Sequence, residues 1–168
     1  MADVIEHWNK EGVITFQSTD PMNEPATNYW GANSNKQEGC HFSQGESQSK
    51  ILVALNEELK NKGINIIISG TDETNSGYNG GQGGQIDSYN KLSDEAKAVL
   101  GRIDTHTYTR SSLSDLSALA QSEGKNLWMS EVDGSYTAGT NAGEMSAALG
   151  LALSLIHISE PTRQEAIS

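Results

Sequence analysis

Apolar positions along the chain alternate between helical spacing and short strand-like runs. Some segments carry apolar residues at i, i+3 and i+4, and the segments between them are rich in β-branched or aromatic residues. The predicted helices span residues 1–11, 51–62, 93–100 and 113–123, and the predicted strands span residues 13–19, 64–69, 102–108 and 126–131. Strict alternation of helix and strand builds right-handed βαβ units. The sequence therefore predicts an α/β fold with a parallel sheet, either doubly wound or barrel-shaped.

Polar residues gather near the ends of the predicted strands. Those at or just after a strand end are Glu24, Asp72, His106, Tyr108 and Glu131. The carboxyl ends of parallel strands meet at one rim, and polar residues from several strands at that rim are typical of a (β/α)8 active site. A doubly wound sheet also binds ligands at this edge, but no Gly-x-Gly-x-x-Gly follows the first predicted strand. The pattern therefore favours a partial TIM barrel.

Two glutamates have similar settings in the sequence. Glu24 follows an apolar run within Asp20 to Pro25, where two prolines fix the backbone and stop the strand. Glu131 ends another apolar run. Retaining hydrolysis of a glycosidic bond needs one carboxylic acid to protonate the leaving oxygen and one carboxylate to attack the anomeric carbon. The pair therefore predicts a glycosidase site, in which the amide of Asn23 donates to a sugar hydroxyl.

Alternation along the last predicted strand separates Trp128 from Glu131. Successive side chains point to opposite faces of a strand, so Leu127, Met129 and Glu131 share one face, and Trp128 and Ser130 share the other. If Glu131 faces the barrel axis, Trp128 packs outward against helices. This argument favours a core role for Trp128 over stacking on a sugar.

Four more residues are candidates for contacts with the substrate or with Glu131. His106 and Tyr108 share a strand face and either orient Glu131 by hydrogen bonds or form a polar pair at a strand end. Tyr29 and Trp30 either stack on apolar sugar faces or pack the long loop 21–45 onto the domain. The residues alone leave both choices open.

Composition limits the expected partners of the protein. The 168-residue chain has 11 Lys and Arg against 22 Asp and Glu, a formal net charge of −11, and no basic stripe is visible. Nucleic acid and anionic membranes are therefore not expected partners. Cys40 is the single cysteine, and Cys40-His41 lacks the further spaced ligands that a metal site needs.

Two other segments carry expectations. The Gly-rich segment 77–85 has no Gly-Lys-Ser/Thr ending, so a phosphate cradle is not expected and a flexible rim loop is. The longest apolar stretch, residues 147–158, is interrupted by serines and a histidine and is too short to span a bilayer.

Six motifs occur in the order in which one enzyme family carries them. They are Pro21-Met-Asn-Glu-Pro25, Tyr29-Trp-Gly-Ala32, Gln37-Glu-Gly-Cys-His41, Ile68-Ser-Gly-Thr-Asp-Glu-Thr-Asn75, Asp104-Thr-His-Thr-Tyr108 and Leu127-Trp-Met-Ser-Glu-Val-Asp-Gly134. With them the chain resembles glycoside hydrolase family 30, and within it the endo-β-1,6-galactanase-like group. The resemblance implies that Glu24 is the acid/base, Glu131 the nucleophile and Asn23 the partner of the sugar 2-hydroxyl.

The resemblance also implies a substrate and a location. It indicates a secreted enzyme, without metal or organic cofactor, that cleaves β-1,6-galactan side chains such as those of arabinogalactan. The remaining substrate-binding candidates on this mapping are Tyr29, Trp30, Asp72, His106 and Tyr108.

On this mapping, residues 1–152 hold strands four to seven of a (β/α)8 barrel, whose complete form takes about 250 residues. We therefore expect a fragment with open sheet edges and little or no activity by itself. Residues 153–168 resemble a translated sequencing adapter and are expected to be a non-native tail. Two alternatives remain open: another family 30 activity such as β-1,6-glucanase, and a non-catalytic sugar-binding or nonfunctional fragment.

Overall fold

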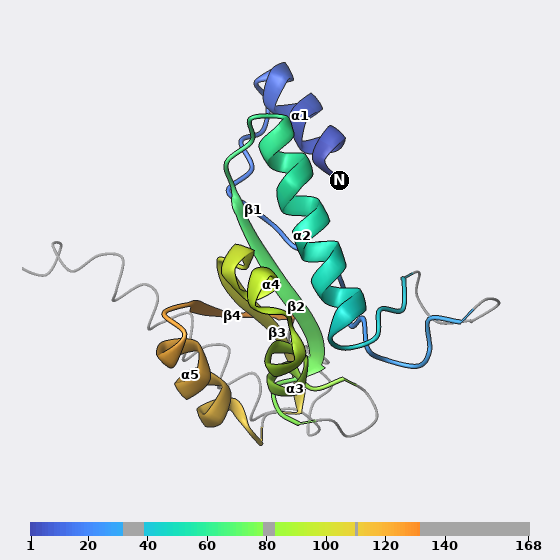
Figure 1. The fold of residues 1–168 in the computed structure, drawn as a ribbon, viewed down its shortest axis with the longest axis vertical. Helices are drawn as coiled ribbons and strands as arrows, with labels where there is room; N and C mark the ends of the chain where they lie inside the picture. Colours follow the sequence, from blue (N-terminus) through green and yellow to red (C-terminus); the bar gives the residue numbers. More distant parts are fainter. Residues whose placement is uncertain (32–38, 79–82, 110, 132–168) are drawn as a thin grey trace, which may run out of the picture. The chain divides into compact units, whose positions relative to one another are not determined.

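Parallel strands form one sheet in the order in which they occur along the chain (Figure 1). The computed structural model describes residues 1–31, 39–78, 83–109 and 111–131, which all belong to one unit, Met1–Val132. The strands are β1 (Ser18–Thr19), β2 (Ile67–Asn75), β3 (Arg102–Thr109) and β4 (Asn126–Glu131). A doubly wound sheet reverses its strand order, whereas sequential order with β4 turned steeply across β2 gives a curled half-barrel. The prediction of a partial barrel is confirmed.

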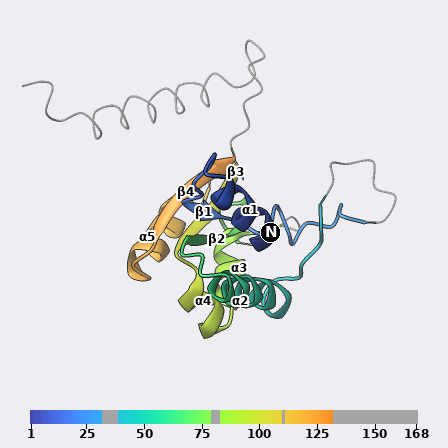
Figure 2. The same cartoon turned by 90° about the horizontal axis from the view of Figure 1, so that it is seen from above.

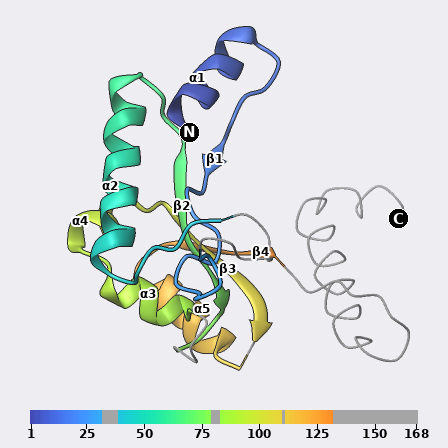
Figure 3. The same cartoon turned by 90° about the vertical axis from the view of Figure 1, so that its right-hand side faces the viewer.

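Helices gather on one face of this sheet (Figures 2 and 3). They are α2 (Glu46–Asn61), α3 (Gln85–Lys91), α4 (Asp94–Val99) and α5 (Leu113–Ser122). A further helix, α1 (Ala2–Glu11), contacts α2. This is the layering of a barrel segment, in which helices lie outside and the strands present their other face to the barrel interior.

The hydrophobic core lies between the sheet and the helices. Leu52, Leu55 and Leu59 project from one side of α2 and are buried. Ile68 of β2 and Ile103 of β3 belong to the same buried cluster. Burial against the sheet therefore explains the helical spacing of these leucines. In the apolar run before Ser69, Ile68 is buried, Ile64 and Ile66 pack against the cluster, and Ile67 is exposed.

Residues at helix ends explain where two helices begin or end. Gly12 follows α1 with φ 67°, a left-handed conformation that glycine adopts without a Cβ penalty. The Ser93 hydroxyl accepts a hydrogen bond from the Ala96 N–H and caps α4. Both signals are visible in the sequence, and both helix ends lie where the sequence predicts them.

One expectation near the N-terminus is wrong. The predicted strand 13–19 is reduced to β1, and the Val13 side chain is 71% exposed. The reason is that β1 pairs with β2 only through Ser18 and Thr19. Before them, Gln17 accepts one hydrogen bond from the Ile67 N–H and Phe16 packs against the core, while Val13 and Ile14 are exposed. In α1, Val4 and Trp8 are exposed, while Ala2 and Ile5 face the core.

A helix that was not predicted begins at the end of the Gly-rich segment 77–85. This helix is α3, and its Ile86 and Tyr89 are buried in the core. The apolar pair at i and i+3 follows so closely on the glycines that their loop signal masked it. Asp72, expected after a strand, lies inside β2, because β2 continues to Asn75 through polar residues.

No helix among the described residues is long and apolar enough to cross a membrane. The apolar stretch 147–158, the boundary at residue 152 and the tail 153–168 lie outside the described residues.

Candidate active site

Glu24 lies in a tight turn shortly after β1. The Asp20 carboxylate accepts a hydrogen bond from the Met22 N–H at 3.0 Å, which turns the chain away from the strand. Glu24 has φ 45°, a left-handed conformation that costs a non-glycine residue about 1–3 kcal/mol. The Glu24 N–H donates to the Asp72 carbonyl oxygen (2.9 Å), and the Thr27 N–H donates to the Glu24 carbonyl oxygen (3.1 Å). Such strain at a buried glutamate is typical of a functional site.

Two β-bulges bring further side chains to the same place. At Asp72, β2 has one residue more than β3, and at Ser130, β4 has one residue more than β3. Asp72 also has a positive φ of 61°. The Ser130 hydroxyl donates a hydrogen bond to Asp72 Oδ1, so the two bulged residues contact each other. Bulges are over-represented next to active sites because they re-aim side chains.

The imidazole ring of His106 connects the acidic side chains. Its Nδ1 lies 3.2 Å from Glu24 Oε1, and its Nε2 lies 3.3 Å from Asp72 Oδ2 and 3.6 Å from Glu131 Oε2. The ring is almost completely buried. The two glutamates singled out in the sequence therefore contact different nitrogens of one histidine.

Electrostatics favour the charged form of His106. Burial by itself lowers the pKa of the imidazole. The hydrogen bond to Asp72 and the negative charges of Asp72, Glu131 and Glu24 raise the pKa, and the net shift is upward. Both ring nitrogens of a protonated histidine are donors. The charged ring is thus placed to donate to Glu24 and to Asp72 at the same time.

Each glutamate also accepts a hydrogen bond from a tyrosine. The Tyr108 hydroxyl donates to Glu131 Oε1 at 2.5 Å, and the Tyr29 hydroxyl donates to Glu24 Oε2. The two carboxylates differ in access, because the side chain of Glu131 is 42% exposed and that of Glu24 is 7% exposed. Glu131 is therefore the carboxylate that an incoming molecule reaches directly.

The loop aromatics pack onto the turn that contains Glu24. The rings of Tyr29 and Trp30 meet edge to face with centroids 4.7 Å apart. The indole N–H of Trp30 donates to the Glu24 carbonyl oxygen at 2.8 Å. Both residues therefore contact Glu24 in this structure, and their stacking on a sugar stays a prediction. Asn23 is partly buried beside Glu24, and within the described residues no hydrogen bond joins its amide to the other candidates.

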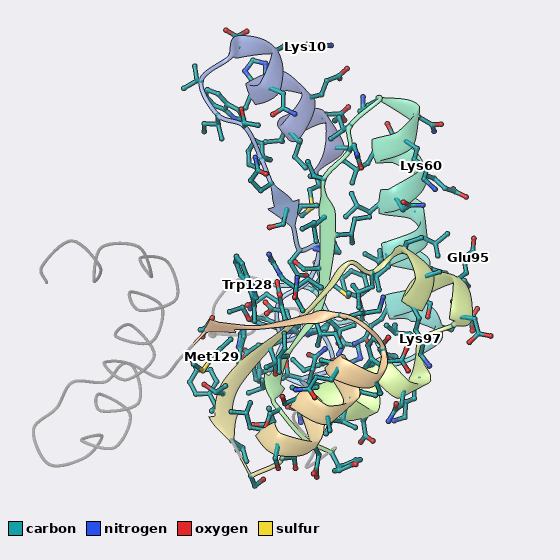
Figure 4. The ribbon with its side chains drawn as sticks, turned by 90° about the vertical axis from the view of Figure 1, so that its left-hand side faces the viewer. Lys10, Lys60, Glu95, Lys97, Trp128 and Met129 are labelled. Carbon is teal, nitrogen blue, oxygen red and sulfur yellow. The ribbon has the colours of Figure 1, made fainter. Side chains whose placement is uncertain are left out.

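Trp128 is not a core residue, and the alternation argument was wrong for it. Its side chain projects from β4 (Figure 4). Trp128 is 54% exposed, and it pairs in register with Asp104. The Arg102 guanidinium lies 3.7 Å from the centroid of the Trp128 ring system. The bulge at Ser130 breaks the alternation of β4, so Trp128 and Glu131 lie on the same side of the strand.

A buried ion pair on β3 was missed at the level of sequence. Arg102 donates to both carboxylate oxygens of Asp104, at 2.6 and 2.9 Å, and to the Ser69 hydroxyl at 3.1 Å. The sequence feature that could have revealed it is the occurrence of polar residues at every second position, Arg102, Asp104 and His106, which places them on one face of the strand. Asp20 was also missed, and its Oδ2 atom is buried without a hydrogen-bond partner among the described residues.

The arrangement suits acid–base and nucleophilic chemistry on a polar substrate. One carboxylate is buried beside a histidine whose pKa is raised by the neighbouring acidic groups, and a second is exposed and accepts a hydrogen bond from a tyrosine hydroxyl. In the described part of the chain, no group of three or more His, Cys, Asp or Glu side chains is arranged to hold a metal ion. A groove of about 670 Å³ lies between α2 and α4, on the helical face, and none of the candidate residues lines it.

Two known proteins are similar to this chain. An endo-β-1,6-galactanase of Hypocrea rufa is 29% identical over 141 residues, which cover 83% of this chain and 28% of the relative. An exo-β-1,6-galactobiohydrolase of Bifidobacterium longum subsp. longum is 30% identical over an alignment of 192 positions, which covers 90% of this chain and 12% of the relative. The chain thus spans less than a third of the length of either relative. No protein-family model and no solved structure matches the chain.

Proposed function

We propose that this chain carries the two catalytic carboxylates of a retaining glycoside hydrolase of family 30 that cleaves β-1,6-galactan. The observation that supports this most directly is the contact of both Glu24 and Glu131 with the ring of His106. It brings two carboxylates from distant parts of the chain together, as glycoside hydrolysis requires. The printed activities of the two relatives supply the substrate of the proposal.

In the first step, Glu131 attacks the anomeric carbon and Glu24 donates its proton to the leaving glycosidic oxygen. The bond between the anomeric carbon and that oxygen breaks, and a glycosyl ester forms on Glu131. In the second step, Glu24 takes a proton from water, and the resulting hydroxide oxygen displaces Glu131 from the anomeric carbon. The exposure of Glu131 and the hydrogen bond from Tyr108 support its role as nucleophile.

The neighbouring residues have supporting roles in this proposal. Asn23 donates to the sugar 2-hydroxyl, and Tyr29, Trp30 and Asp72 border the same space around Glu24. His106 holds the carboxylates in place, because its charged ring is a donor on both sides. The mechanism requires no metal or organic cofactor. Because the substrate is a polymer, we propose that the enzyme acts outside the cell.

The test uses the full-length product of the parent gene, with β-1,6-galactan and β-1,6-glucan as substrates. We expect short galactose oligomers, and NMR of the first product should show retention of the β configuration. Glu24→Gln and Glu131→Gln should each lower kcat by at least about 100-fold. The control is Glu123→Gln, which makes the same change at an exposed carboxylate whose partner is Tyr89.

Three outcomes would contradict the proposal. A product with inverted configuration would show that Glu131 is not a nucleophile. Cleavage of β-1,6-glucan but not of β-1,6-galactan would show a β-1,6-glucanase. Binding of the sugar without cleavage would show a binding module.

A further inference from the structure

Glu73 is a buried carboxylate that the proposed chemistry does not use. It follows Asp72 in β2, and its exposure is 0%. Its neighbour contacts His106, whereas the Glu73 side chain contacts residues of α2 and α3. In the described part of the chain, no lysine, arginine or histidine forms an ion pair with Glu73.

Three separate segments donate hydrogen bonds to this carboxylate. Gln48 Nε2 of α2 and the Ser88 hydroxyl of α3 donate to Oε1, at 2.7 and 2.6 Å. The Ala26 N–H, in the turn after Glu24, donates to Oε2 at 3.3 Å. A carboxylate is an acceptor only, so one buried side chain satisfies donors from two helices and a loop.

The contact with Ala26 links Glu73 to Glu24. Ala26 lies inside the turn that the Thr27 N–H closes on the Glu24 carbonyl oxygen. The Glu24 N–H donates to the carbonyl oxygen of Asp72, the residue just before Glu73. Two consecutive residues of β2 therefore hold both sides of one turn. A left-handed glutamate persists only where its surroundings hold it, and these contacts are such surroundings.

The backbone around Glu73 is also shaped to its carboxylate. Gly83 has φ 70°, and a Cβ atom placed on it would lie 2.1 Å from Glu73 Oε2. The same Cβ would lie 3.2 Å from the Ala26 Cβ. Only glycine therefore allows the chain to pass over the contact between Glu73 and Ala26.

We propose that Glu73 is a positioning residue for Glu24, and that it acts through the amide of Ala26. The carboxylate fixes the turn and so sets the direction of the Glu24 side chain toward His106. The expected effect on turnover rests on the proposed function, whereas the hydrogen bond from the Ala26 N–H to Glu73 does not depend on it. A displacement of about 1 Å in a reacting group can cost 100-fold in rate, so this contact is expected to matter for turnover.

The first test measures amide hydrogen exchange by NMR in the 168-residue chain. In the wild-type chain we expect a protected Ala26 amide, because Glu73 Oε2 is its acceptor. In Glu73→Gln its exchange should be at least tenfold faster, while the Leu55 and Leu59 amides of α2 keep their protection. Glu123→Gln is the matched control and should leave Ala26 unchanged. An unprotected Ala26 amide in the wild-type chain would overturn the proposal even if the Glu73 variant does not fold.

The second test measures turnover in the full-length enzyme. Glu73→Gln should lower kcat at least tenfold and change KM less than twofold, because the substrate contacts remain. A variant that loses both kcat and stability, but whose Ala26 amide exchanges no faster than in the wild type, would show a purely structural role for Glu73. That result would overturn the proposal. If the wild-type enzyme has no glycosidase activity, the proposed function fails, and the exchange result still decides the role of Glu73 in the turn.

Discussion

His106 is surrounded by acidic side chains from three different segments of the chain. Glu24 comes from the turn after β1, Asp72 from β2 and Glu131 from the end of β4. A neutral histidine has one donor and could satisfy only one of its two close partners, whereas the charged ring satisfies both. The arrangement therefore makes the stability of this region depend on protonation of one side chain.

Replacement of His106 by glutamine should destabilise the protein most at low pH. The pKa of His106 is raised in the folded state, so its stabilising contribution is complete below about pH 6.5, the ordinary pKa of histidine, and is lost as the pH rises through the folded-state pKa. The measurement is urea unfolding of wild type and His106→Gln between about pH 5.5 and pH 8.5. A difference in unfolding free energy that grows with pH would contradict this assignment.

Asp20 shows the opposite situation, a partly buried carboxylate whose buried Oδ2 atom has no hydrogen-bond partner among the described residues. Burial raises its pKa well above the ordinary value, and the charge of Asp72 adds to the shift. Its contribution is therefore favourable only while it is protonated, and it is lost as the pH rises through the folded-state pKa. Asp20→Asn keeps an acceptor for the Met22 N–H and should raise the unfolding free energy by about 1 kcal/mol at pH 7.

The control for this prediction is the same comparison under acidic conditions. Near pH 4, where the folded protein carries a protonated Asp20, the gain from Asp20→Asn should become smaller. A gain that is equal at both pH values would show that the carboxylate charge is not the cause.

At the scale of elements, the bulges decide what the strands present to the site. A regular β4 would direct Trp128 and Glu131 to opposite faces. The extra residue at Ser130 brings both to the same face, and the extra residue at Asp72 directs its carboxylate to His106. Simple alternation predicted the strand itself but could not predict these side-chain directions, because a bulge depends on the pairing with the neighbouring strand.

Gly83→Ala should destabilise the segment that leads into α3 by about 1–3 kcal/mol. The substituted residue would have to keep φ 70° and would place its Cβ 2.1 Å from Glu73 Oε2. Gly12→Ala is a matched control, since Gly12 has φ 67° and nothing within 4 Å of its Cβ position. Urea unfolding should show the larger loss for Gly83→Ala. Equal losses would mean that backbone strain alone, and not the clash with Glu73, determines the cost.

At the scale of the whole molecule, the described strands form an open half-barrel. The two edge strands each have a neighbour on only one side among the described strands: β1 pairs with β2, and β4 pairs with β3. Trp128 is exposed on the face that a complete barrel would enclose. Open edges and exposed aromatic residues favour association between chains.

On the proposed function, the purified 168-residue chain should hydrolyse β-1,6-galactan at least about 100-fold more slowly than the full-length protein, because half of the rim proposed to position the sugar is absent from the described sheet. Light scattering should show association that increases with protein concentration. A kcat/KM equal to that of the full-length enzyme would show that the half-barrel suffices for catalysis.

The sequence by itself determined the alternation of helices and strands, the parallel sheet and the short set of polar residues from which the site is built. These properties are local, because side-chain spacing and helix caps act within a few residues. The roles proposed for Glu24 and Glu131 stay predictions until their variants are measured.

Only the tertiary structure decided which of these residues meet, and how. The strand order selected the half-barrel, the bulges at Asp72 and Ser130 set the direction of their side chains, and Gln48, Ser88 and Ala26 converged on Glu73. These features depend on pairing and packing between segments that are far apart along the chain. No local pattern in the sequence specifies such contacts, because their free energy exists only once the segments have come together.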